Sequence, residues 1–169
     1  MLNVLGRSTA ERAKSIAIVI LAGLLLLSLW QASSDRAQAQ RESRDRQAVT
    51  DVARRFAIAL TTYDYAHPNI QMLAVAEVAS PAIRARVTAA FTDLARAKAS
   101  SIGDVTNSIV ETLSGSRAEV LVRTSQVISG GYAAPGTELS GMLDTAIISL
   151  GSGWVVSDYS WLPTPGGAP

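Results

Sequence analysis

The stretch that decides the fold is residues 100–162, SSIGDVTNSIVETLSGSRAEVLVRTSQVISGGYAAPGTELSGMLDTAIISLGSGWVVSDYSWL. Four segments in it are rich in Val, Ile, Thr and aromatic residues, which favours strands, and Gly, Ser and Pro separate them. The predicted strands are Val105–Leu113, Arg117–Ile128, Glu138–Leu150 and Trp154–Leu162. Because the turns between them are too short for crossover helices, the strands are predicted to form an antiparallel meander.

Three helices are predicted before the strands. The first ends near Thr61 and carries an apolar stripe at helical spacing. The stripe consists of Val49, Val52, Phe56 and Leu60. After a break at Pro68, Asn69 is the predicted N-cap of a second helix over 70–79. The dipeptide Ser80-Pro81 marks the start of a third helix, which runs to about residue 99.

Three helices followed by four antiparallel strands predict an α+β domain over residues 48–162. The helices must cover one face of a curved sheet, and this order of elements resembles the cone-shaped, nuclear-transport-factor-like fold. Residues 163–169 are rich in Pro and Gly, which predicts a disordered tail.

The region before the domain predicts a membrane anchor. Residues 15–34 carry no charge and would extend about 30 Å as a helix, the thickness of one hydrocarbon layer. We expect a cytoplasmic tail over 1–14, a transmembrane helix over 15–34 and a polar helical stalk over 35–47. The tripeptide at residues 37–39 imitates a signal-peptidase site, but Asp35 and Arg36 intervene, so a retained anchor is favoured over a cleaved signal peptide.

Charge is distributed unevenly along the chain. Residues 1–46 hold seven basic and four acidic residues, whereas residues 47–169 hold eight basic and ten acidic ones. The mildly acidic domain argues against nucleic-acid binding. Basic residues flank the predicted span almost equally, and the short N-terminal tail favours a cytoplasmic N-terminus with the domain outside the cytoplasm.

Side-chain composition restricts the chemistry. The chain has no cysteine and one histidine, which excludes disulfides, thiol catalysis and sites that need two imidazoles. We predict no cofactor, no metal and no catalytic residue. The glycines at 151 and 153 predict a hairpin turn rather than a phosphate-binding loop. Strand alternation points Asp158 to solvent and places Trp154 and Trp161 on opposite faces.

The densest polar run is Thr61-Thr62-Tyr63-Asp64-Tyr65-Ala66-His67. Its tyrosine, aspartate and histidine types could carry out acid–base chemistry. At a helix end, however, such residues commonly cap the helix and hold the following turn by hydrogen bonds, and this structural interpretation is favoured. A contact with a partner protein is the second interpretation, with Tyr63, Asp64 and Tyr65 as the candidate residues.

Two segments carry a resemblance to a family. Residues 56–65, FAIALTTYDY, and residues 153–158, GWVVSD, are similar to a helix-end run and a closing strand of the Mce-associated membrane proteins. Mce complexes import lipids across the envelope of mycolate-walled bacteria. The resemblance implies a non-catalytic accessory or assembly subunit of such a transporter, anchored to the permease by its span and in contact with Mce subunits and surrounding membrane lipids. The residues of the span that would meet the permease are Ala22, Gly23, Ser28 and Trp30, the first three being small enough for close helix packing.

Two other functions remain open. An assembly factor of a type IV secretion or conjugation channel has the same organisation of one span and a cone-fold domain. A membrane-tethered cone-fold isomerase or dehydratase would need a closed cavity with a buried carboxylate beside a tyrosine, and solvated Asp64 and Asp158 would argue against it.

Overall fold

The computed structural model describes residue 36 and residues 38–131, 134–151 and 153–163. The chain divides into two compact units, Met1–Arg44 and Asp45–Pro169. The predicted tail over 1–14, the predicted span and the tail beyond 163 lie outside the described residues, and so do Ala22, Gly23, Ser28 and Trp30. In the first unit, residues 38–44 are helical and exposed. No helix among the described residues is long and apolar enough to cross a membrane.

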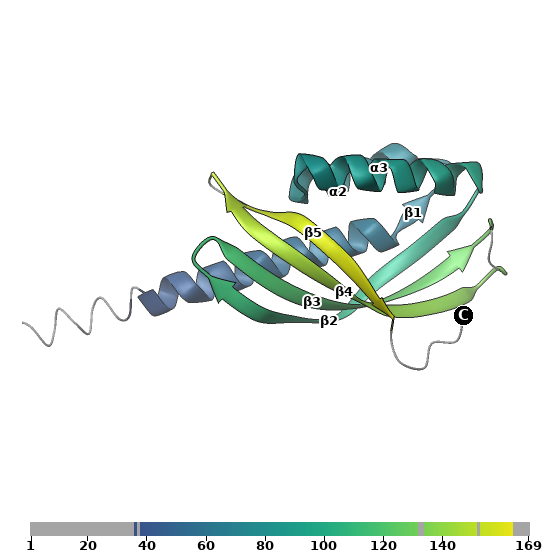
Figure 1. Ribbon diagram of the computed structural model, residues 1–169. Helices are drawn as coiled ribbons and strands as arrows, with labels where there is room; N and C mark the ends of the chain where they lie inside the picture. The colour runs from purple at the N-terminus through teal and green to yellow at the C-terminus, as the bar shows by residue number, and fades with distance from the viewer. Residues whose placement is uncertain (1–35, 37, 132–133, 152, 164–169) are drawn as a thin grey trace, which may run out of the picture. The chain divides into compact units, whose positions relative to one another are not determined.

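The second unit contains helical residues 45–61 followed by seven further elements. These are β1 (Tyr63–Asp64), α2 (Pro68–Val78), α3 (Pro81–Arg96), β2 (Ser100–Ser114), β3 (Arg117–Ser129), β4 (Thr137–Leu150) and β5 (Gly153–Pro163). The five strands form one antiparallel sheet in the order β1-β2-β3-β4-β5. Figure 1 shows the sheet strongly curved, with α2 and α3 along one side of it. The predicted α+β class and the antiparallel meander are confirmed.

Several details of the prediction are wrong, among them the start of the first long strand, which is Ser100 rather than Val105. The sheet has five strands rather than four, because Tyr63 and Asp64 pair with Ser101 and Ser100 at the start of β2. The second helix begins at Pro68, and His67 rather than Asn69 is its N-cap. A proline suits the first helical position, since it lacks the N–H that has no intrahelical partner there, and it keeps the preceding residue out of the helix.

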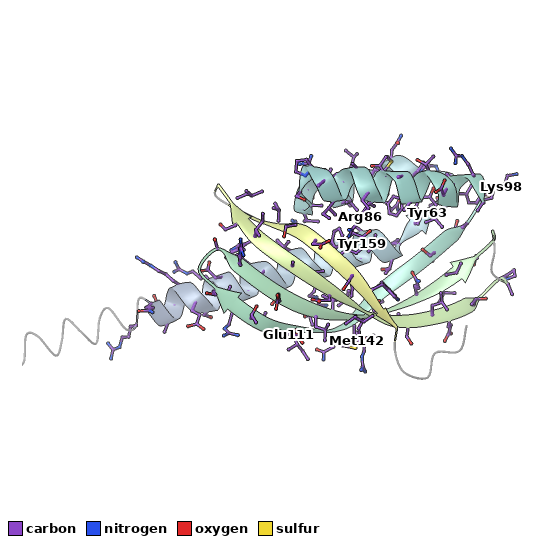
Figure 2. The ribbon with its side chains drawn as sticks, in the orientation of Figure 1. Tyr63, Arg86, Lys98, Glu111, Met142 and Tyr159 are labelled. Atoms are coloured by element: carbon purple, nitrogen blue, oxygen red, sulfur yellow. The ribbon has the colours of Figure 1, made fainter. Side chains whose placement is uncertain are left out.

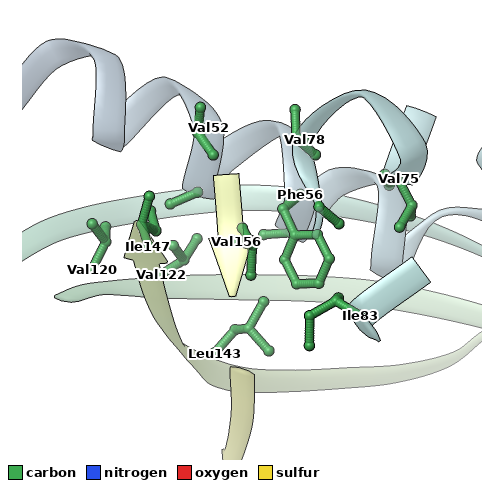
Figure 3. Close-up of a cluster of buried hydrophobic side chains, with 14 of the residues drawn as sticks. Val52, Phe56, Val75, Val78, Ile83, Val120, Val122, Leu143, Ile147 and Val156 are labelled. Carbon is green, nitrogen blue, oxygen red and sulfur yellow. The ribbon is translucent and has the colours of Figure 1, made fainter. Parts of the chain in front are cut away.

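The core lies between the helices and one face of the sheet (Figure 3). Phe56 of the first helix is fully buried, and it belongs to the same core as the alternate residues Val120 and Val122 of β3 and Leu143 of β4, which are also fully buried. Burying each such side chain contributes about 1.5–3 kcal/mol. The predicted apolar stripe of the first helix therefore does face the core, as does the face of α3 that carries Ile83, Val87 and Phe91.

A bulge in β5 corrects the prediction for the two tryptophans. The β4 residues Ala146 and Ile147 pair with Asp158 and Val156, so Ser157 is an extra residue in β5. One inserted residue reverses the side-chain alternation beyond it. Trp154 pairs with Ser149 of β4, and Trp161 pairs with Leu143. The two tryptophans, seven residues apart, consequently lie on the same face of the sheet, the one that the helices cover, and not on the two different faces that were predicted.

Candidate functional site

Tyr63 is buried and serves the fold. Its side chain is 2% exposed, its hydroxyl donates a hydrogen bond to the Phe91 carbonyl at 2.9 Å, and the two rings lie 4.8 Å apart. Burial raises the pKa of the Tyr63 phenol above its ordinary value, and the Asp64 carboxylate adds to the rise. The prediction that Tyr63 contacts a partner has to be corrected, because it offers almost no accessible surface.

Asp64 and His67 close the loop that follows β1. The Asp64 carboxylate accepts a hydrogen bond from the Ala66 N–H at 2.9 Å and contacts His67 Nδ1 at 2.8 Å. The hydrogen bond with His67, followed by that with Ala66, holds the pKa of Asp64 below its ordinary value. Both side chains are largely exposed, so this is a solvated turn of the kind that the structural interpretation predicted. The Tyr65 side chain is 46% exposed to solvent, and its hydroxyl forms no hydrogen bond with another described residue.

The described residues do not form the buried acid–base pair that the enzyme alternative requires. Besides Tyr63, their buried polar side chains are those of Thr61, Thr124 and Thr145. Asp64 and Asp158 are both solvated, at 45% and 70% side-chain exposure. No group of three or more potential metal ligands is found within the described part of the chain.

Asp158 takes part in a contact that holds α3 against the edge strand β5. Arg86 reaches its carboxylate at 3.2 Å and donates to the Tyr159 carbonyl at 2.9 Å. The Arg86 guanidinium also lies 3.9 Å from the centre of the Tyr159 ring, and Figure 2 shows the two side chains together. Stacking and hydrogen bonding by one arginine give this contact a structural role.

A small cavity is lined by residues of the first helix, α3 and the strands β1, β2, β3 and β5. Its volume is about 250 Å³, and most of its lining is apolar. The lining includes Leu60, Tyr63, Leu94, Ile128 and Trp161, with Gln126 among the polar residues. The volume is below the range of about 300–1,000 Å³ that is usual for small-molecule sites, and the wall carries no ionisable group besides Tyr63. It therefore suits one inserted side chain better than a substrate.

A second cavity, of about 320 Å³, lies between the first helix and α2; we call it the helix groove. The residues that line it are Arg55, Ile58, Ala59, Thr62, Ile70, Gln71, Ala74 and Glu77. Ile58 and Ile70 are 41% and 63% exposed, and the adjacent Leu73 is 68% exposed. Exposed apolar side chains gathered around a concave surface are typical of interaction sites.

The sequence contained a signal for this groove that periodicity alone did not use. The α2 sequence, PNIQMLAVAEV, has apolar residues on every side and one charge, Glu77. A helix that is hydrophobic all round is normally covered on all sides. In the structure only Val75 and Val78 are fully buried, so the opposite side of α2 is an apolar surface without a described neighbour.

A third cavity, of about 500 Å³, lies on the outer face of β2, β3 and β4. Ile102 and Val127 line it together with the carboxylates of Asp104 and Glu138. The Asp104 carboxylate already accepts a hydrogen bond from the Val105 N–H at 2.8 Å, which is a local backbone contact.

Comparison with known proteins identifies the fold but no family. No protein-family model matches the chain, and no curated protein matches it. A periplasmic fragment of TraM superposes with a TM-score of 0.56 and 9% identity, over 70% of this chain and 98% of that one. CagV, a VirB8 homologue of the type IV secretion system of Helicobacter pylori strain 26695, gives 0.55 and 10%, over 70% and 99%. The intermembrane space region of the chloroplast protein ARC6 gives 0.53 and 15%, over 70% and 96%.

At these identities the comparisons show a shared fold alone. The domain has the α+β fold, a curved antiparallel sheet covered by helices, that TraM and the VirB8 homologue CagV also have. None of the comparisons bears on the resemblance to the Mce-associated proteins, which stays a prediction.

Proposed function

We propose that the chain is a non-catalytic, membrane-tethered assembly subunit of a type IV secretion or conjugation channel, with its α+β domain outside the cytoplasm. The observation that carries the proposal is the fold. TraM and CagV share it over nearly their whole described length, the first as a periplasmic fragment and the second as a component of such a system. The ARC6 region, from an organelle's intermembrane space, adds to the TraM fragment a second example of the fold in a compartment between membranes.

Two properties of this chain support the same role. The uncharged residues 15–34 precede the domain and are long enough for one membrane span. The domain also exposes apolar side chains on its surface, since Ile58, Ile70 and Leu73 are exposed around the helix groove. A tether followed by an exposed apolar surface fits a subunit that binds other proteins.

An accessory subunit of an Mce lipid-import system is the second candidate. The observation in its favour is the resemblance of residues 56–65 and 153–158 to that family. It shares the tether and the extracytoplasmic domain with the first candidate, and the two differ in the proteins that the chain contacts.

Affinity purification of the tagged full chain in mild detergent, followed by mass spectrometry, tests the proposal. The control is an unrelated single-span protein with the same tag at the same expression level. Enrichment of secretion-channel subunits over the control is expected, and deletion of the gene should lower the levels of those subunits and impair transfer. Enrichment of a permease and Mce subunits would replace the proposal by the second candidate, and enrichment of neither set would reject both.

A further inference from the structure

The outer face of the sheet, which the helices do not cover, carries a stripe of apolar side chains across the four long strands. We call it the outer stripe, and its members are Ile109 in β2, Leu121 in β3, Met142 in β4 and Leu162 in β5. Ile109 pairs with Leu121, and Met142 pairs with Leu162. Ile109 and Leu162 are 55% and 43% exposed, and Figure 2 shows Met142 on the side of the sheet away from α2 and α3. The adjacent residues Val122 and Leu143 face the core instead, so the stripe is an apolar surface that the domain leaves uncovered.

Two opposite charges flank the outer stripe where it passes from β3 to β4. The register of these strands sets Leu121 opposite Asp144 and Arg123 opposite Met142. Arg123 therefore lies on one side of the stripe and Asp144 on the other. Arg123 is exposed and Asp144 is half-buried, and neither side chain forms an ion pair or a hydrogen bond with another described residue. Both charges are available to a molecule that covers the stripe.

This arrangement is complementary to itself. Neighbouring strands lie about 4.8 Å apart, and residues on the same face of one strand are about 7 Å apart, so the four residues form a compact rectangle. Leu121 and Met142 occupy one diagonal, and Arg123 and Asp144 occupy the other. A two-fold axis that runs along the stripe, between two copies stacked face to face, brings each stripe residue onto the same residue of the second copy. It also brings Arg123 of each copy opposite Asp144 of the other, as an isologous interface requires.

The edges of the sheet are less suited to a second chain than its outer face. In the edge strands β2 and β5, side-chain oxygens already accept backbone N–H groups that a further strand would need. These contacts join Asp104 to the N–H of Val105, Asn107 to the N–H of Ser108 and Asp158 to the N–H of Tyr159, each at 2.8 Å. Because the helices cover the inner face, the outer face remains for a second chain.

The charges of the outer face also bear on what covers it. On β2, β3 and β4 they include the carboxylates of Asp104, Glu119, Glu138 and Asp144 and the guanidinium groups of Arg117 and Arg123. An anionic membrane surface would be repelled by this excess of carboxylates. Figure 1 shows the sheet curving toward the helices, so the outer face is convex. Two such faces touch along their central part, where the stripe lies, and the carboxylates near the strand ends diverge from those of the second copy.

We propose that the outer face of the sheet binds a second copy of the chain, with the outer stripe on the two-fold axis and an Arg123–Asp144 ion pair on each side of it. The stripe supplies the apolar contact, and the two ion pairs fix the register. The inference goes beyond the proposed function and does not rest on it. Self-association and co-purification with channel subunits are measured separately, and either can fail while the other stands.

Crosslinking through single cysteines tests the position of the axis, because the chain has no cysteine of its own. The full chain carries Ile109→Cys or Leu162→Cys and is kept in nonionic detergent with micelles in excess. A short bismaleimide spans the roughly 10 Å between stacked sheets. Each variant should give a crosslinked dimer, since each residue meets its own copy at the axis. The matched control Ile102→Cys lies on the same face away from the stripe, is 76% exposed, and should stay monomeric. Equal yields at all three positions, or no dimer at 109 and 162, would overturn the proposal.

Charge reversal tests whether the occupant is a second copy. Arg123→Asp or Asp144→Arg alone sets like charges together on both sides of the axis, so the crosslink yield from position 109 should fall about tenfold. An equimolar mixture of the two variants, each with its own tag, restores both ion pairs in the mixed dimer, and the crosslinked product should carry both tags. The control Glu138→Arg changes an exposed charge away from the stripe and should leave the yield unchanged. An undiminished yield in the single variants, or a loss that mixing does not reverse, would overturn the proposal.

Discussion

The substitution Gly103→Ala should be severe, because the end of the first helix lies directly against Gly103 in β2. A methyl group at this position would overlap Oγ1 and Cβ of Thr61 and come within 2.9 Å of the Thr61 backbone carbonyl carbon. The obstacle includes backbone, so a side-chain rotation cannot relieve it. Either β2 or the helix end has to move.

The cost can be worked out from the contacts at that point. Relieving the overlap costs about 1–3 kcal/mol, as in other overpacked cores. The same shift weakens the hydrogen bonds from the Gly103 N–H to Thr62 Oγ1 at 3.2 Å and from Ser101 Oγ to the Thr61 carbonyl at 2.6 Å. These contribute about 0.5–1.5 kcal/mol each. Alanine also restricts the backbone of the unfolded chain more than glycine does, which stabilises the folded state by about 0.4–1 kcal/mol and offsets part of this loss. We expect the free energy of unfolding to fall by about 3 kcal/mol, taking these terms together.

Urea unfolding of the full chain in nonionic detergent, followed by far-ultraviolet circular dichroism, measures this loss. The matched control is Gly153→Ala at the start of β5, where a methyl group would meet no atom within 4 Å. The control should change the free energy of unfolding by less than about 0.5 kcal/mol. Equal stability of the two variants would refute the close packing of the helix end on β2.

Three further substitutions test single contacts in the same unfolding assay. Tyr63→Phe should lower the free energy of unfolding by about 1 kcal/mol, since it removes one buried hydrogen bond; wild-type stability would argue against that bond. Asp64→Asn should lower the melting temperature at neutral pH. Because the folded-state pKa of Asp64 lies below 3.8, wild type should lose this advantage as pH falls through the lowered value, and a difference that persists at lower pH would contradict the assignment. Gly141→Ala would place a methyl group 2.6 Å from Trp161 Cε2. Because the exposed ring can move away, we expect a red-shifted tryptophan fluorescence and a loss of less than about 1 kcal/mol in the free energy of unfolding. An unchanged spectrum would be inconsistent with this placement of Trp161.

The elements of the fold were predictable because each has a local signal. Turn residues bound all four long strands, and Ser80-Pro81 marks the start of α3 where the structure has it. The features that the sequence did not predict depend on tertiary contacts. The two-residue strand β1 exists because the chain passes along Ser100 and Ser101, and no pattern of two residues can announce such pairing.

The bulge at Ser157 shows the same limit more sharply. Alternation predicts faces correctly only within an unbroken register, and one inserted residue inverts every prediction beyond it. The segment from residue 154 to 162 has no glycine or proline at the bulge to signal it. The helix groove is a different case. Its signal, an α2 that is apolar on all sides, was in the sequence, but where the exposed side lies depended on how α2 packs.

The run from Thr61 to Asp64 bears on the choice between the two candidate functions. Each of its side chains is engaged by the fold, since Thr61 packs on Gly103, Thr62 bonds to Gly103, Tyr63 bonds to Phe91, and Asp64 closes the turn. Such a run reports the geometry of the fold rather than a particular partner. The resemblance of this run to the Mce-associated proteins therefore fits any protein in which a helix ends against a curled sheet in the same way. A specific partner would be recognised by surfaces that the fold does not use, such as the helix groove, Tyr65 and the outer face of β2, β3 and β4.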